Sequence, residues 1–76
     1  MKYESKRLYA VRGTHREAMV RKGTYLCEGK FVVDFYYDGL PDHEWKRGSH
    51  GISCDICDTL DQAKRKADYY VGKDNR

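Results

Sequence analysis

Cysteine and histidine side chains in this 76-residue chain are the groups most able to hold a metal ion. Cys54 and Cys57 form a Cys-x-x-Cys pair, and His43, His50 and Cys27 could complete a tetrahedral shell of the thiolate and imidazole ligands that zinc prefers. Strong zinc modules pair two ligand dyads across a gap, whereas here one cysteine dyad accompanies two histidines in a glycine-containing segment. We therefore predict no bound metal. The alternative is a small zinc-binding domain that uses these residues as ligands, which we call the zinc alternative.

The pattern around the cysteine pair also favours a structural role. Alternation from Gly51 to Cys57 places Ile52, Cys54 and Ile56 on one face, so we expect Cys54 to pack in the core as a small apolar side chain. The odd number of cysteines and the lack of an apolar leader argue against a disulfide framework. We expect reduced thiols in a soluble, cytoplasmic protein that does not enter a membrane.

Residues able to act as a nucleophile, an acid or a base do not occur in the patterns that catalysis needs. Ser49 and His50 are neighbours without an oxyanion-loop motif, Asp42 and Glu44 share one loop, and no glycine cradle precedes the C-terminal helix. A chain of this length also cannot enclose a drug-sized pocket and keep a core of its own. We therefore expect neither an enzyme nor a cofactor.

The longest segment without a regular pattern, Asp38 to His50, carries the only tryptophan. Long loops in compact domains are usually functional or disordered. Trp45 is followed by Lys46 and Arg47, and tryptophan and arginine dominate the energetics of protein interfaces. We predict that these three residues anchor a partner and that Trp45→Ala weakens binding but leaves the fold intact. The alternative is that Trp45 folds back and closes the edge of a thin core.

The formal net charge of +3 conceals an uneven distribution: residues 1–30 carry +5, residues 31–58 carry −4 and residues 59–76 carry +2. Opposed charge blocks steer and orient the docking of a protein partner. We assign this orienting role to Arg12, Arg16, Arg21 and Lys22. The same basic third could instead bind nucleic acid directly, or form an ordinary solvated face. The acidic middle block and the absence of a known nucleic-acid-binding signature favour a protein partner.

A helix after residue 58 is the clearest element. Thr59 to Gln62 forms a capping box, and Gly72 supplies a stop. The apolar stripe of this helix consists of Leu60, Ala63, Ala67, Tyr70 and Val71. The outward face consists of Asp61, Gln62, Arg65, Asp68 and Tyr69, and the run Lys64 to Lys66 is assigned to helix surface.

Strands are predicted over the preceding part of the chain. Lys30 to Tyr37 is the best strand, and Leu8 to Arg12, Thr24 to Cys27 and Gly51 to Cys57 are the others. Residues 14–22 fit either a short helix, through a second capping box, or a strand, and we favour the strand.

These elements predict a single α+β domain over residues 1–76, in which a small antiparallel sheet of three to five strands packs against one C-terminal helix. Residues 73–76 are expected to be a disordered tail. The exposed edges of so small a sheet could pair with a second copy of the chain, giving a homodimer, or with a strand of another partner.

The final strand, Gly51 to Cys57, leads into a helix that opens Thr-Leu-Asp-Gln-Ala-Lys at residues 59–64 and closes Tyr-Tyr-Val at residues 69–71. In a short, charged, tyrosine-rich chain, this arrangement resembles the proteins that bacteriophages and mobile elements use against host machinery. That group includes small inhibitors of bacterial RNA polymerase and anti-CRISPR proteins, several of which are a small sheet packed on one helix. The resemblance implies a non-catalytic protein that docks on a nucleic-acid-processing complex and modulates or blocks it, and it carries over no functional residue.

Overall fold

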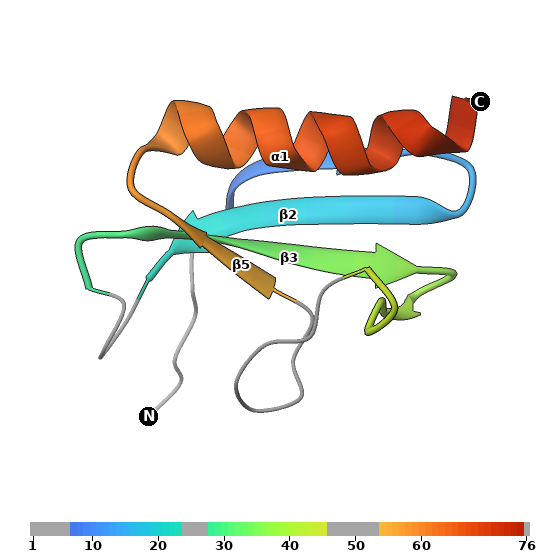
Figure 1. Ribbon diagram of the computed structural model, residues 1–76, viewed down its shortest axis with the longest axis horizontal. Coiled ribbons are helices and arrows are strands. Elements are labelled where there is room, and N and C mark those ends of the chain that lie inside the picture. Colours follow the sequence, from blue (N-terminus) through green and yellow to red (C-terminus); the bar gives the residue numbers. More distant parts are fainter. Residues whose placement is uncertain (1–6, 24–27, 46–53, 76) are drawn as a thin grey trace.

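The computed structural model describes residues 7–23, 28–45 and 54–75. Five strands precede a single long helix. They are β1 (Arg7–Arg12), β2 (Arg16–Lys22), β3 (Phe31–Tyr37), β4 (Leu40–Pro41) and β5 (Cys54–Cys57), followed by α1 (Leu60–Gly72) and a short 3-10 helix (Lys73–Asn75). The strands form one antiparallel sheet in the order β1-β2-β3, with β4 and β5 both paired to the remaining edge of β3. Figure 1 shows α1 lying along one face of this sheet. The predicted α+β fold is confirmed.

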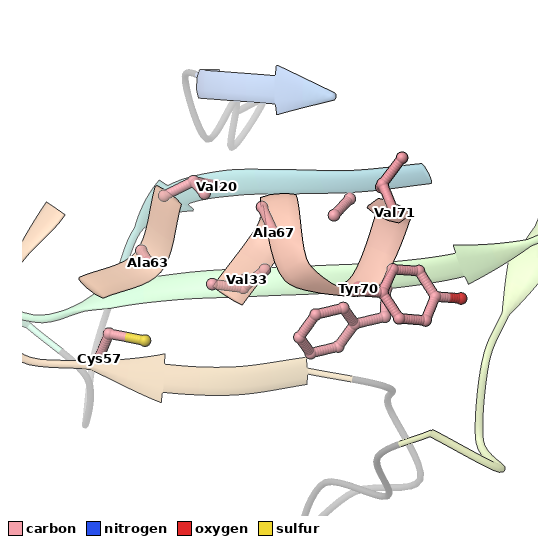
Figure 2. Close-up of a cluster of buried hydrophobic side chains, with 9 residues drawn as sticks. Val20, Val33, Cys57, Ala63, Ala67, Tyr70 and Val71 are labelled. Atoms are coloured by element: carbon pink, nitrogen blue, oxygen red, sulfur yellow. The ribbon is translucent and has the colours of Figure 1, made fainter. Parts of the chain in front are cut away.

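The core lies between α1 and the sheet. Strand register places Val20 opposite Val33 and Ala18 opposite Phe35, and all four side chains face the helix. Ala63 and Ala67 are fully buried, and their small side chains allow α1 to approach the strands closely. Figure 2 shows these alanines between β2 and β3 in the view, with Tyr70 and Val71 completing the buried stripe of the helix. The predicted apolar stripe of α1 is therefore confirmed.

Local hydrogen bonds explain where α1 begins. The Thr59 hydroxyl accepts a hydrogen bond from the backbone N–H of Gln62 at 3.2 Å, as the predicted capping box requires. The Gln62 side chain accepts in return from the backbone N–H of Asp58, also at 3.2 Å, one residue before the N-cap.

None of the described helices has the length and apolar character that crossing a membrane requires.

The structure shows the conformation of two segments whose sequence patterns are ambiguous or alternating. Residues 16–22 form strand β2, so the strand interpretation of residues 14–22 is confirmed. The expected packing of Cys54 in the core is wrong, because the alternation is shifted by one residue. Cys57 is 4% exposed and faces α1, whereas Cys54 and Ile56 lie on the opposite face, where Ile56 is 48% exposed. Asp55 lies on the helix side because Lys66 of α1 pairs with its carboxylate, and this polar contact reverses the expected alternation. The predicted strand 24–27 and residues 51–53 lie outside the described residues.

The end of the helix contradicts the expected disordered tail over residues 73–75. The Asp74 carboxylate, 4% exposed, accepts hydrogen bonds from the backbone N–H groups of His15 and Arg16 at 2.8 and 2.6 Å. Burial alone would raise the pKa of this carboxyl, but the two backbone donors and the Arg16 charge together hold the pKa below its ordinary value. Because these donors lie just after the β1–β2 turn, Asp74 fastens the C-terminal end of α1 to the sheet.

Gly13 makes this close approach feasible, and its substitution tests the fastening. A Cβ at position 13 would lie 2.6 Å from Asp74 Oδ2 and 2.9 Å from Val71 Cγ1. We expect Gly13→Ala to destabilise the fold by about 1–3 kcal/mol through overpacking. The matched control is Gly72→Ala, whose Cβ would meet no atom within 4 Å and which should be neutral or stabilising by up to ~1 kcal/mol. Equal effects of the two substitutions in urea denaturation would contradict this account.

Candidate partner-binding groove

A cavity of about 380 Å³ opens between α1 and the sheet. We call it the Trp45 groove, and its lining in the described part of the chain consists of Phe35, Trp45, Asp55, Arg65, Lys66 and Tyr69. Phe35 comes from β3 and Asp55 from β5, while the last three residues share one flank of α1. The loop after β4 contributes Trp45. The groove is therefore built by segments from distant parts of the sequence.

Tyr70 positions the loop that carries Trp45. The Tyr70 side chain is fully buried, and its hydroxyl donates to the carbonyl of Tyr36 at 2.9 Å and to Asp42 Oδ2 at 2.7 Å. The backbone N–H of Trp45 in turn donates to Asp42, with its side-chain oxygen at 3.1 Å and its carbonyl at 3.2 Å. Burial and then the hydrogen bond to Asp42 raise the pKa of Tyr70, so its hydroxyl stays a donor. One buried side chain thus fixes both the helix and the tryptophan loop.

The Trp45 ring packs onto the edge of the core. Its centroid lies 5.1 Å from that of Tyr70 and 6.2 Å from that of Phe35, both in edge-to-face geometry, and 6.0 Å from that of Tyr69. Such aromatic pairs are stabilising beyond the area that they bury. Trp45 remains half-buried, so one part of the ring closes the core while another part lines the groove.

Positive charge predominates among the unpaired groups around the groove. Lys66 and Asp55 form an ion pair at 2.5 Å, which raises the pKa of Lys66 and neutralises both charges. The Lys73 ammonium lies 5.1 Å from the Trp45 ring centroid and 5.2 Å from the Tyr69 centroid, in cation–π contact with both. Arg65 is exposed and has no ion pair within the described residues. Arg65 and Lys73 therefore leave the groove with a net positive rim.

None of the four basic residues assigned to orientation lines the Trp45 groove, although Arg16 lines a neighbouring cavity together with Trp45. Arg12 and Arg21 lie on the sheet face opposite α1, where they pair with Glu17 at 3.5 Å and with Asp34 at 2.8 Å. Arg16 lies on the helix side, beside Asp74 and Tyr70. Lys22 is exposed at the end of β2. Lys46 and Arg47, the expected companions of Trp45, lie outside the described residues.

Arg16 connects the sheet to the end of α1. Its Nε lies 3.5 Å from Asp74 Oδ1, and its guanidinium lies over the rings of Tyr70 at 5.1 Å and Tyr37 at 5.5 Å. The Nε and Nη1 atoms of Arg16 are buried without a hydrogen-bond acceptor. The faces of the two tyrosine rings and the Asp74 carboxylate therefore surround the guanidinium. Arg16 therefore has a structural role in the fold, because most of its side chain is buried between the sheet and the end of α1.

The cysteine pair does not form the dyad that the zinc alternative requires. Cys57 pairs with Phe31 on the helix side of the sheet, whereas Cys54 pairs with Asp34 on the opposite side. Two side chains on opposite faces of one strand cannot share an ion. His43 is described, but His50 and Cys27 lie outside the described residues, and the described residues hold no cluster of three metal-ligating side chains.

The helix residues in and beside the groove were not selected from the sequence as site residues. Arg65 and Tyr69 were predicted on the outward face of the helix, Lys66 was assigned to helix surface, and Lys73 to the disordered tail. Tyr69 is 54% exposed, and its position next to the apolar stripe is the one signal that could have drawn attention to it. Their proximity to Trp45 depends on tertiary packing, which sequence spacing does not reveal.

Comparisons with models of protein families, with curated proteins and with solved structures found no match to this chain.

The role of Tyr70 in placing Trp45 can be tested by removing one oxygen atom, that of the Tyr70 hydroxyl. We expect Tyr70→Phe to keep the ring packing but to leave the Tyr36 carbonyl and Asp42 Oδ2 without the hydroxyl donor, at a cost of about 1–3 kcal/mol in unfolding free energy. Trp45, the only tryptophan, should become more accessible to acrylamide, so its fluorescence should be quenched more strongly. The matched control is Tyr69→Phe, since the exposed Tyr69 hydroxyl has no such bond. Unchanged quenching in a folded Tyr70→Phe protein would show that the Tyr70 hydroxyl does not hold the Trp45 loop in place.

Proposed function

We propose that this protein is a non-catalytic binding protein that uses the Trp45 groove to dock on a protein component of a machine that handles nucleic acid, and thereby modulates or blocks that machine. The observation that carries this proposal is the convergence of Trp45, Tyr69 and Arg65 on one concave surface. Tryptophan, tyrosine and arginine are the residues that contribute most binding energy at protein interfaces. The kind of machine follows from the resemblance of residues 51–71 to short bacteriophage proteins.

Preorganisation of the groove supports a binding role. Trp45 is held through its backbone by Asp42 and through its ring by Phe35 and Tyr70. A side chain that is already ordered loses little conformational entropy when a partner binds, so more of the contact energy contributes to affinity. Tyr69 lies on α1, a regular helix that is capped by Thr59 at its start and held to the sheet by Asp74 after its end.

Direct binding of nucleic acid by the basic N-terminal third has weaker support. Such binding needs cations that are free to replace counterions and aromatic faces that are free to stack on bases. Arg12, Arg16 and Arg21 each lie beside a carboxylate of the same chain. In the groove, Lys73 already lies against the rings of Trp45 and Tyr69, so a stacking base would have to displace it.

Affinity capture from a bacterial lysate, with nuclease treatment and at two salt concentrations, tests the proposal. We expect the tagged protein to retain a defined protein after nuclease treatment and Tyr69→Ala to reduce its recovery at least ~10-fold, as for an interface hot spot. Tyr69→Ala tests the groove more specifically than Trp45→Ala does, because Trp45→Ala would also remove contacts to the core.

The matched control is Leu40→Ala, which truncates a 70% exposed apolar side chain outside the groove and should leave recovery unchanged. Circular dichroism confirms that both variants fold. Recovery that is equal for wild type and Tyr69→Ala would refute the groove as the docking surface. Material that is captured only without nuclease and that is lost at high salt would instead support direct binding of nucleic acid.

A further inference from the structure

We infer that the Trp45 groove recognises an acidic segment of its protein partner, one that inserts an apolar side chain against Trp45 and Tyr69 and places carboxylates beside Arg65 and Lys73. This inference rests on the proposed function and specifies the chemistry of the partner at that same surface. It follows from three features of the groove: its charge, its size and its boundary with a neighbouring cavity.

Charge complementarity selects an acidic segment. The acidic residue of the groove, Asp55, is neutralised by Lys66, whereas Arg65 and Lys73 have no carboxylate partner within the described residues. Asp61, one helical turn before Arg65, forms no ion pair with it in this structure. Asp68 faces away toward β1, where its carboxylate accepts a hydrogen bond from the Tyr9 hydroxyl at 2.6 Å. The flank of α1 that borders the groove is therefore basic, and opposite charge on the partner would favour and orient docking.

The size and lining of the groove select an apolar anchor. A volume of about 380 Å³ lies at the low end of the roughly 300–1,000 Å³ that ligand pockets occupy. This space suits an inserted side chain better than a large ligand. Phe35 forms part of the lining, and the Trp45 and Tyr69 rings border it, so an aliphatic or aromatic side chain would exchange water for apolar contact.

Trp45 also separates the groove from a second cavity. This cavity, of about 590 Å³, shares Trp45 as a lining residue, and its charged lining residues are Asp42, Glu44 and the largely buried Arg16. Both oxygens of the Asp42 carboxylate already accept hydrogen bonds from within the chain, and Glu44 is exposed. The carboxylates of the partner should thus lie over α1, and not over the loop between β4 and Trp45.

Selection from a random peptide library displayed on phage tests this inference. With the wild-type protein as bait and Tyr69→Ala as the counter-selected bait, we expect enriched peptides to combine aspartate or glutamate with a leucine, phenylalanine or tryptophan. Their synthetic copies should change Trp45 fluorescence and should bind at least ~10-fold more weakly in high salt, as screened charge pairs do. A basic or uncharged consensus would overturn the inference.

Charge reversal on α1 provides the second arm and a matched control. We expect the Arg65→Glu, Lys73→Glu double variant to lose at least ~10-fold in affinity for the selected acidic peptides, because both unpaired cations become anions. The Arg7→Glu, Lys64→Glu double variant makes the same change in net charge away from the groove, at the exposed start of β1 and on the other flank of the helix, where Lys64 lies over the Tyr9 ring, and should leave affinity unchanged. Equal losses in the two proteins, both folded by circular dichroism, would contradict specific recognition at the groove.

The same variants separate failure of this inference from failure of the proposed function. In lysate capture, recovery that depends on Tyr69 but is insensitive to the double charge reversal would keep the groove as a docking surface and overturn the acidic partner. Recovery that is insensitive to Tyr69→Ala would overturn the proposed function itself.

Discussion

The buried hydroxyl of Tyr70 is the constraint on which the rest of this structure depends. A phenol this deeply buried must find acceptors, and it finds them in the Tyr36 carbonyl of β3 and in the Asp42 carboxylate of the following loop. The first bond sets the position of α1 relative to the central strand. The second bond fixes the loop that presents Trp45. A small domain with few large apolar side chains thus uses one tyrosine both to fill its core and to build its binding surface.

The other end of this arrangement is the contact between Asp74 and the turn after β1. Gly13 allows the carboxylate to approach, and the backbone N–H groups of His15 and Arg16 hold it. Because Asp74 directly follows Lys73, this contact also places the ammonium group that lies against Trp45 and Tyr69. The cationic rim of the groove is therefore a consequence of how the helix ends.

Local patterns predicted the parts of the fold that depend on near neighbours. The capping box at Thr59 and the stripe that includes Ala63 and Ala67 identified α1, since both signals lie within a few residues. The exchange of Cys57 for Cys54 in the core was missed because β5 is short and its register depends on the distant pair of Lys66 and Asp55. For the same reason, the sequence identified Trp45 as a candidate residue but not its surroundings, which come from the far end of the chain.

The central claim is that a protein partner contacts the groove beside Trp45, and chemical-shift mapping tests it most directly. Isotopically labelled protein would be titrated with the captured partner and followed by amide and indole NMR signals. The account predicts the largest perturbations at the Trp45 indole, Arg65, Tyr69 and Lys73. Perturbations gathered instead around Arg12 and Ile56, on the sheet face opposite α1, with the Trp45 indole unchanged, would contradict it.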